Sequence, residues 1–494
     1  MTRRKSILAS LVAIAFTMSL CSHWLFGHSA QAQALDDCQV ATAAINQKAM
    51  LRQAALAGDA TSQKSYQALL AQHGQSLMQC RSQSQFQTQA VWLRLYPCDS
   101  KPGVLEAVLD RIVDRGYNQI YVDTFSNGQV LLPSGANPTP WSSVVQAPGY
   151  EQTDLLAQII QKGHDRGLKV YAWMFALNFG YTYALRPDRQ QVLARNGQGD
   201  TSLTVGTKVS QDTSVDLTVQ DEIFADPYNT QAQSDYLQLV QTVLRRQPDG
   251  ILFDYIRYPK GIGSASIASK VKDLWIYSEA SQQALYQRAQ NQKGLELIRR
   301  YVAQGNVTAN DIAAVNKLYP TEKEPRWQGR ATGGASKGLT AIQADLWNLV
   351  VAHAMQGPID FLTAAAAAAQ QQGIAVGAAF FPEANQAIGR GFDSRLQAWD
   401  RFPAAIEWHP MAYGLCGDPS CINAQVQKVL GQAPSGTIVA PVLTGQWQQA
   451  TERPSLEAQM WALRSLSPPI RSISHFSFGW QERQLERDRQ FCRL

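Results

Sequence analysis

The stretch Asp249-Gly-Ile-Leu-Phe-Asp-Tyr-Ile-Arg-Tyr-Pro259 is a short apolar run that ends in charged and aromatic residues. Ile251 to Phe253 fit a strand in the interior of the fold. Asp254 and Arg257 follow where this strand should emerge, and burying such groups is costly unless they are paired or used. The pattern predicts a buried strand whose end carries either a catalytic carboxylate or a structural Asp–Arg ion pair.

Similar apolar runs recur along residues 90–480. The eight runs are Ala90–Pro97, Gln119–Ser126, Lys169–Leu177, Gly250–Pro259, Ile374–Pro382, Ala404–Gly414, Ile438–Trp447 and Ser472–Trp480. Amphipathic stretches such as Gly103–Arg115 and Leu155–Arg166 lie between them, which indicates parallel strands joined by crossover helices. Eight strands close a (β/α)₈ barrel, so we expect an α/β fold of this kind over residues 87–494. An open doubly wound sheet is the alternative, but no Gly-rich phosphate loop follows the first run.

Two long insertions interrupt the pattern. Asn178 to Asn229 follows the third run, and Lys260 to about Thr340 follows the fourth. Both leave the C-terminal ends of strands, which is the face where barrel active sites lie. We expect these insertions to shape a binding cleft; a surface elaboration without a function is the alternative.

The first 34 residues have the pattern of an export signal. Arg3 to Lys5 precede the apolar run Ile7 to Cys21, and Ala32-Gln33-Ala34 offers a small-x-small cleavage site. We therefore expect a cleaved signal peptide at residues 1–34 and an exported protein, either periplasmic or extracellular. An uncleaved anchor is the alternative, and it is the only reason to expect a membrane contact.

The net charge of the chain depends strongly on that leader. The whole chain has 44 basic and 39 acidic residues, and residues 1–34 hold three of the basic residues and no acidic one. The remainder has 41 and 39, so its net charge falls from +5 to +2. Because no basic tract remains, we expect no nucleic-acid partner.

Residues 35–86 differ from the rest in being rich in Ala, Gln, Leu and Ser. They carry two apolar helical stripes that Gly58-Asp59 separates, so the pattern predicts a helical hairpin. This segment shows no chemistry and is expected to act as a cap, a spacer or a docking surface.

Six cysteines follow the leader, and an even number in an exported chain indicates disulfides. Cys38 and Cys80 lie equally far from the turn at Asp59, so they would meet at the open end of the hairpin. Cys416–Cys421 would join close neighbours in a loop, which leaves Cys98–Cys492. Free buried thiols are the alternative.

Carboxylates accompany several other predicted strand ends. Asp123 ends the second run, Glu383 follows the fifth, and Glu407 lies in the sixth. Hydrolysis of a glycosidic bond needs an acid for the leaving oxygen and a second carboxylate as nucleophile or base. Each carboxylate alone is more readily explained as structural, so it is their convergence with Asp254 that indicates this chemistry.

Aromatic residues lie near the same ends: Trp92, Trp173, Trp408, Tyr413, Trp447 and Trp480. Flat rings suit the apolar faces of pyranose sugars, although any single Trp is more often a core residue. The polar side chains expected to bind sugar beside them are Arg94, Asn178, Arg257, Tyr258 and His409.

Motifs for other chemistries are missing from the sequence. It contains no Gly-x-Ser-x-Gly elbow, no His-Glu-x-x-His helix and no P-loop. His409 has no second metal ligand at helical spacing. We therefore predict neither a metal nor a cofactor.

The chain resembles the bacterial glycosyl-hydrolase-like family 10, a family of DUF187-type barrels, over about residues 88–480. The matching motifs are Ala90-Val-Trp-Leu-Arg94, Gly167-Leu-Lys-Val-Tyr-Ala-Trp173, Arg186-Pro-Asp-Arg189, Ala225-Asp-Pro-Tyr228 and, most specifically, Asp249-Gly-Ile through Tyr258-Pro259. The resemblance implies a barrel fold, glycosidase activity and a rim aspartate at Asp254. The family commonly has paired aspartates where this chain has Asp254-Tyr255, and an Asp where Glu407 precedes Pro410-Met-Ala-Tyr413.

Together these patterns favour a glycoside hydrolase that acts on a cell-envelope or extracellular polysaccharide. Asp254 would be the nucleophile or base, and Glu407 the acid, with Glu383 as its rival. Arg257 and Asp123 would orient the pair. The competing hypothesis is a non-catalytic carbohydrate-binding or envelope-organising barrel attached through its hairpin; a lyase or deacetylase is a weaker third. The sequence predicts no oligomeric state.

Overall fold

The computed structural model of the chain describes residues 38–146, 148–205, 222–331 and 338–493. The predicted signal peptide lies outside these residues. Within them, no helix combines the length and the apolar character that crossing a membrane requires.

Eight parallel strands form the wall of a barrel, as predicted. They are β1 (Thr88–Leu93), β2 (Gln119–Ser126), β5 (Lys169–Phe175), β6 (Gly250–Asp254), β8 (Ala375–Phe380), β11 (Glu407–Pro410), β12 (Val442–Thr444) and β13 (Ser472–Phe476). Their order in the sheet is β11-β8-β6-β5-β2-β1-β13-β12. Parallel bridges from Trp408 to Val439 and from Met411 to Val442 link the two ends of this order, so the barrel is nearly closed.

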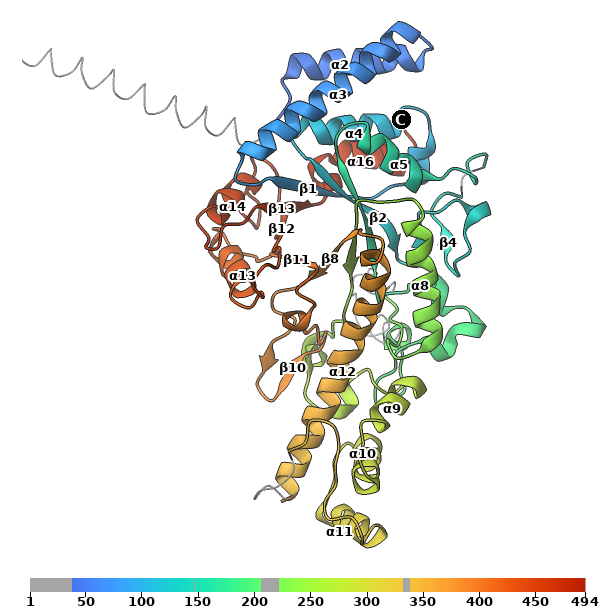
Figure 1. Cartoon of the computed structure of the whole chain (residues 1–494), viewed down its shortest axis with the longest axis vertical. Coiled ribbons are helices and arrows are strands. Elements are labelled where there is room, and N and C mark those ends of the chain that lie inside the picture. Colours follow the sequence, from blue (N-terminus) through green and yellow to red (C-terminus); the bar gives the residue numbers. More distant parts are fainter. Residues whose placement is uncertain (1–37, 147, 206–221, 332–337, 494) are drawn as a thin grey trace, which may run out of the picture.

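Helices connect and cover these strands (Figure 1). They are α2 (Thr42–Leu56), α3 (Ala60–Gln83), α4 (Val104–Asp114), α5 (Leu155–His164), α6 (Tyr181–Ala184), α8 (Thr230–Leu244), α9 (Glu279–Tyr286), α10 (Gln292–Gln304), α11 (Ala309–Leu318), α12 (Leu339–Gln370), α13 (Ser420–Leu430), α14 (Leu456–Leu463), α15 (Phe478–Gln481) and α16 (Arg483–Gln490). Because the helices lie outside the barrel, its strands are buried on both faces.

The segments after β5 and β6 are the longest connections. The first contains α6 and leads into α8, and Asn178 pairs with Phe224 across it. The second contains α9 to α11 and the start of α12, which form the end of the molecule opposite the α2–α3 hairpin (Figure 1). It also contributes β7 (Ile267–Ala268) to a small antiparallel sheet with β9 (Ala387–Ile388) and β10 (Gly391–Asp393).

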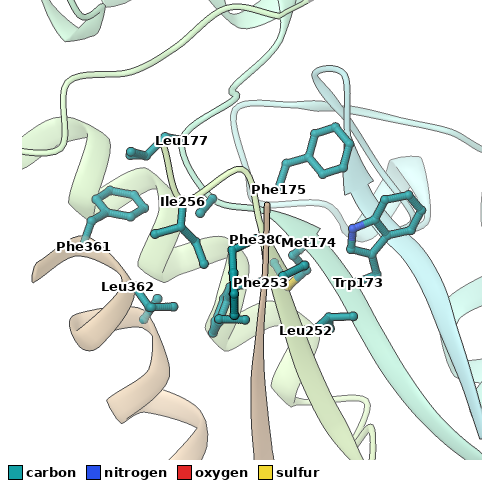
Figure 2. Packing of buried hydrophobic residues seen from close by; sticks show 14 of the residues in the cluster. Trp173, Met174, Phe175, Leu177, Leu252, Phe253, Ile256, Phe361, Leu362 and Phe380 are labelled. Carbon is teal, nitrogen blue, oxygen red and sulfur yellow. The ribbon is translucent and has the colours of Figure 1, made fainter. Parts of the chain in front are cut away.

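The core around β5, β6 and β8 is apolar and includes the crossover helix α12. Met174, Phe253 and Phe380 come from the strands, and Phe361 and Leu362 come from α12 (Figure 2). All five side chains are buried. This packing holds the three strand ends in place, and Asp254 is the last residue of the middle one.

All three predicted disulfides are present. The Cα–Cα distances are 5.7 Å for Cys38–Cys80, 5.4 Å for Cys98–Cys492 and 6.3 Å for Cys416–Cys421. These distances are within the usual range for a disulfide. The first bond closes the α2–α3 hairpin, where Gly58 is left-handed (φ 98°) and the Asp59 side chain accepts a hydrogen bond from Thr61 N at 3.0 Å.

Candidate active site

Asp254 ends β6 at the C-terminal rim of the barrel and is only 6% exposed. Its Oδ2 accepts a hydrogen bond from Trp173 Nε1 at 3.2 Å, and its Oδ1 accepts one from the backbone N of Tyr255 at 2.7 Å. Both oxygens therefore have fixed positions. The carboxylate lies where the sequence predicted the strand to emerge.

The backbone turns sharply immediately after Asp254. Tyr255 has a left-handed conformation (φ 55°), which costs a residue other than glycine roughly 1–3 kcal/mol. Its ring packs against Phe175 at a centroid distance of 4.2 Å. Backbone strain of this kind persists where the surrounding structure requires it, and it is concentrated at functional sites.

The protonation of Asp254 is unusual for an aspartate. Burial raises its pKa to about 6, although the Tyr255 N–H, the Arg257 charge and the Trp173 N–H all act to lower it. The negative charge of Glu222 also raises this pKa. Asp254 can therefore hold or release a proton near neutral pH, as a general acid or base must.

Glu222 is a second carboxylate at this site, and the sequence did not indicate it. Its Oε1 accepts a hydrogen bond from Tyr255 Oη at 2.9 Å, and its Oε2 lies 3.7 Å from Arg257 Nη2. Glu222 belongs to the connection after β5, where no periodic pattern marks a functional position. The one sequence feature that could have indicated Glu222 is its place in an insertion that begins at the C-terminal end of a strand.

Arg257 pairs with Glu222, whereas the sequence suggested Asp254 as its partner. Its guanidinium lies 4.4 Å from the centroid of the Tyr255 ring and 5.6 Å from that of Phe224. Its Nη1 donates to Tyr258 O at 3.0 Å. Arg257 thus fixes the Glu222–Tyr255 pair and acts on Asp254 through its charge.

Arg94 and Asp123 form the other side of the site. Arg94 Nε donates to Asp123 Oδ2 at 2.8 Å, and Ser126 Oγ donates to the same oxygen at 2.8 Å. The Arg94 guanidinium lies 5.9 Å from the centroid of Trp173, the residue that donates to Asp254. The Arg94 side chain is 45% exposed and remains open to a ligand. We call Asp254, Glu222, Arg257, Arg94, Asp123 and Trp173 the rim cluster.

Aromatic rings border the rim cluster. Trp92 is buried beneath it, and its ring contacts Trp173 at 4.7 Å and Phe476 at 5.7 Å. Tyr413 packs against Phe476 at 6.1 Å, and Trp480, which is 44% exposed, contacts the same ring at 6.1 Å. Trp92 is thus buried below the site, whereas one face of the Trp480 ring is exposed to solvent.

Glu383 lies in the loop after β8, beside a different arginine. Its Oε1 accepts from Arg395 Nη1 and Nη2, each at 3.3 Å. Arg395 is buried and also pairs with Asp393 at 2.8 Å. These contacts fix Glu383 in the loop after β8, and none of them joins it to Asp254.

Glu407 and His409 are not at the rim, in contrast to the position that the sequence suggested. Glu407 is the first residue of β11, so it lies at the N-terminal end of that strand. It accepts from Tyr171 Oη at 3.2 Å and is 3.1 Å from His409 Nε2. Tyr171 lies four residues before Phe175, the residue of β5 in register with Asp254, so Glu407 lies deeper in the barrel than Asp254.

The pKa of Glu407 is shifted in the opposite direction from that of Asp254. Although burial acts to raise the pKa of Glu407, its interactions with His409 and Tyr171 hold that pKa below its ordinary value. The His409 ring fits against Gly377, where an added Cβ would lie 2.7 Å from His409 Nε2. The pair fills the barrel interior and is separate from the rim cluster.

Several other residues predicted to bind sugar are buried or hydrogen-bonded within the protein. Asn178 is buried, and its Oδ1 accepts from Gly180 N and Ile223 N at 3.2 and 3.0 Å. Trp408 and Tyr258 are fully buried. Trp447 donates to Tyr117 Oη at 3.2 Å behind β13. Among the described residues, no group of three or more His, Cys, Asp or Glu side chains is arranged to hold a metal ion.

Solved structures similar to this chain include several carbohydrate-processing proteins. The PgaB (BpsB) glycoside hydrolase domain from Bordetella bronchiseptica is 14% identical, with 81% of this chain and 98% of that chain covered and a TM-score of 0.47. A GH18 chitinase from Pseudoalteromonas aurantia is 9% identical, with 80% and 94% covered and a TM-score of 0.34. A GH20 exo-β-N-acetylglucosaminidase from Vibrio harveyi is 8% identical, with 80% and 50% covered and a TM-score of 0.38. Identities and scores this low imply nothing about the site.

The comparison with protein families is more specific. Residues 89–332 match the family model described as Glycosyl hydrolase-like 10. No curated protein matches the chain. The matched region runs from β1 through β6 and includes all six residues of the rim cluster. Residues 89–332 therefore carry the match to the glycosyl hydrolase-like 10 family that the sequence motifs implied.

Proposed function

We propose that this protein hydrolyses glycosidic bonds in a cell-envelope or extracellular polysaccharide. The observation that carries the proposal is the environment of Asp254, a buried carboxylate at the C-terminal end of a barrel strand with a pKa of about 6. A second carboxylate, Glu222, is near enough for its charge to act on Asp254. Two carboxylates in unlike environments suit the acid and the base or nucleophile of a glycosidase.

In the proposed reaction Asp254 is the general acid. Its proton passes to the glycosidic oxygen as the bond from that oxygen to the anomeric carbon breaks, and a water oxygen forms the new bond to that carbon, either directly with Glu222 as base or after a glycosyl–Glu222 intermediate. Glu222 supplies the second carboxylate, because Tyr255 and Arg257 hold it at the same rim. This assignment replaces Glu407 as the partner of Asp254, since Glu407 bonds to Tyr171 deeper in the barrel.

The rest of the rim suits sugar binding. Arg94 and Asp123 offer a donor and an acceptor for hydroxyl groups. Trp173, Tyr413 and Trp480 surround them with aromatic surface suited to the apolar faces of a sugar ring. Three disulfides suit an oxidising compartment, which supports export and an envelope or extracellular substrate.

The first test is the release of reducing ends from a panel of envelope and extracellular polysaccharides. We expect the oxidised, full-length protein to release reducing ends from at least one of them. The matched control is the same protein unfolded by heat. Failure to cleave any glycan, together with measurable binding to one, would overturn the enzymatic proposal.

The pH dependence of this reaction tests the role of Asp254. As an acid, Asp254 must be protonated, and above a pKa of about 6 the protonated fraction falls about tenfold per pH unit. We expect kcat/KM to fall accordingly above pH 6. A rate that instead rises through pH 6 to a plateau would identify Asp254 as the base or nucleophile.

A non-catalytic carbohydrate-binding barrel is the second candidate. Its support is that Glu222 and Asp123 are both already paired, with Tyr255 and Arg94 respectively. Such a protein would bind glycan without releasing reducing ends. Its affinity would change little in the variant Asp254→Asn, whereas Arg94→Ala would weaken it.

A further inference from the structure

The C-terminal helix α16 lies against the end of β1. We propose that Arg489 of α16 is a positioning residue for Arg94, so that the C-terminal helix completes the substrate-binding rim. This inference rests on the proposed function, because it assigns Arg94 to substrate binding. It gives α16 a role at the site.

Arg489 holds the chain just after β1 at two separate points. It is 0% exposed, and its Nη2 donates to the backbone O of Arg94 at 2.8 Å. Its Nε and Nη2 donate to the two oxygens of Asp99 at 2.8 and 2.6 Å. Asp99 in turn accepts from the backbone N of Tyr96 at 2.8 Å. One guanidinium thus fixes the start and the end of residues 94–99.

The strand itself does not fix this segment. β1 ends at Leu93, and its pairing with β2 ends at the same residue. The carbonyl of Arg94 is therefore beyond the last paired residue of the strand, and Arg489 supplies its hydrogen bond. A rim residue placed just outside a sheet depends on contacts of this kind for its position.

Two further contacts hold α16 in place. Glu486 accepts from Tyr96 Oη and from Arg489 Nη1, both at 2.8 Å. The Cys98–Cys492 disulfide joins the same segment to the residue just beyond the helix. The helix is thus attached on both sides of Arg489, which restricts how far its guanidinium can move.

The side chain of Arg94 carries this positioning into the site. Its Nε donates to Asp123, and among the described residues no other acceptor bonds to its guanidinium. The two Nη groups therefore remain for an oxygen of the sugar, either a hydroxyl or a carboxylate. A shift of about 1 Å in such a group can cost up to 10²-fold in rate.

A double-mutant cycle tests whether Arg489 acts through Arg94. The variants are Arg489→Lys, Arg94→Ala and the double variant, assayed for kcat and KM on a glycan that the wild type cleaves. Arg489→Lys keeps a positive charge beside Asp99 but loses the guanidinium Nη2 that donates to Arg94 O. We expect it to lower kcat/KM about tenfold through KM, and the double variant to be no worse than Arg94→Ala alone. Arg487→Lys, an exposed residue of the same helix, is the control and should be neutral.

Additive effects, or full activity of Arg489→Lys, would overturn the inference. Hydrogen exchange of the backbone amides of residues 94–96, 98 and 99 gives a readout that needs no activity: we expect faster exchange in Arg489→Lys and no change in Arg487→Lys. If the wild type cleaves no glycan, the proposed function fails and the cycle is measured on glycan affinity. Even in that case, equal hydrogen-exchange rates in all variants would be enough to reject the positioning role of Arg489.

Discussion

Replacing Asp254 by Asn should reduce kcat for the cleavable polysaccharide by about 10²–10⁴-fold while the protein stays folded. Asn cannot transfer a proton, but it has nearly the same shape and can still accept one of the two hydrogen bonds that Trp173 and Tyr255 donate to Asp254. The measurement is steady-state kinetics at pH 6, with circular dichroism to check the fold.

The identity of the leaving group makes this prediction specific for an acid. A substrate with a good leaving group, such as a dinitrophenyl glycoside of the same sugar, needs little protonation, so Asp254→Asn should slow it far less than it slows the polysaccharide. Asp249→Asn is the matched control, because Asp249 precedes the same strand at its other end, where it accepts from Val170 N at 2.7 Å. Equal losses on both substrates would contradict the role of Asp254 as the acid.

The barrel could be predicted from the sequence because its strands are buried on both faces and read as uninterrupted apolar runs. Each predicted run overlaps one barrel strand, as Gly250–Pro259 overlaps β6. The disulfides followed from the hairpin geometry and from the short spacing of Cys416 and Cys421. In both cases a local pattern was enough to identify the partner.

The site was only partly predictable, for physical reasons. Asp254 follows directly after an apolar run that coincides with its strand, so its position at the rim was visible. Ala404–Gly414 is longer than β11, and the pattern does not tell which part of it is paired; Glu407 in fact begins the strand. Glu222 and Arg489 reach the site only through long-range contacts, which leave no periodic trace in the sequence.

The buried charges beneath the hairpin give the second large prediction. Asp110 of α4 is 2% exposed and accepts from Arg166 Nε and Tyr66 Oη, both at 2.9 Å, and from Arg52. Arg166 is also buried, and Tyr66 belongs to α3, so Asp110 joins the hairpin to the barrel. Replacing Asp110 by Ala leaves the Arg166 charge buried without its partner, which should lower the free energy of unfolding by about 3–5 kcal/mol.

A partly exposed ion pair supplies the control for this prediction. Glu106 of α4 pairs with Lys162 of α5, and both side chains are partly exposed, at 20% and 29%. Glu106→Ala should therefore cost only about 0.2–1 kcal/mol in chemical denaturation of the oxidised protein. The double variant Asp110→Leu with Arg166→Leu, which removes both buried charges, should recover much of the loss. If Asp110→Ala instead produced a separate early transition confined to residues 38–83, the hairpin would be an independent unit whose docking contributes little to the stability of the barrel.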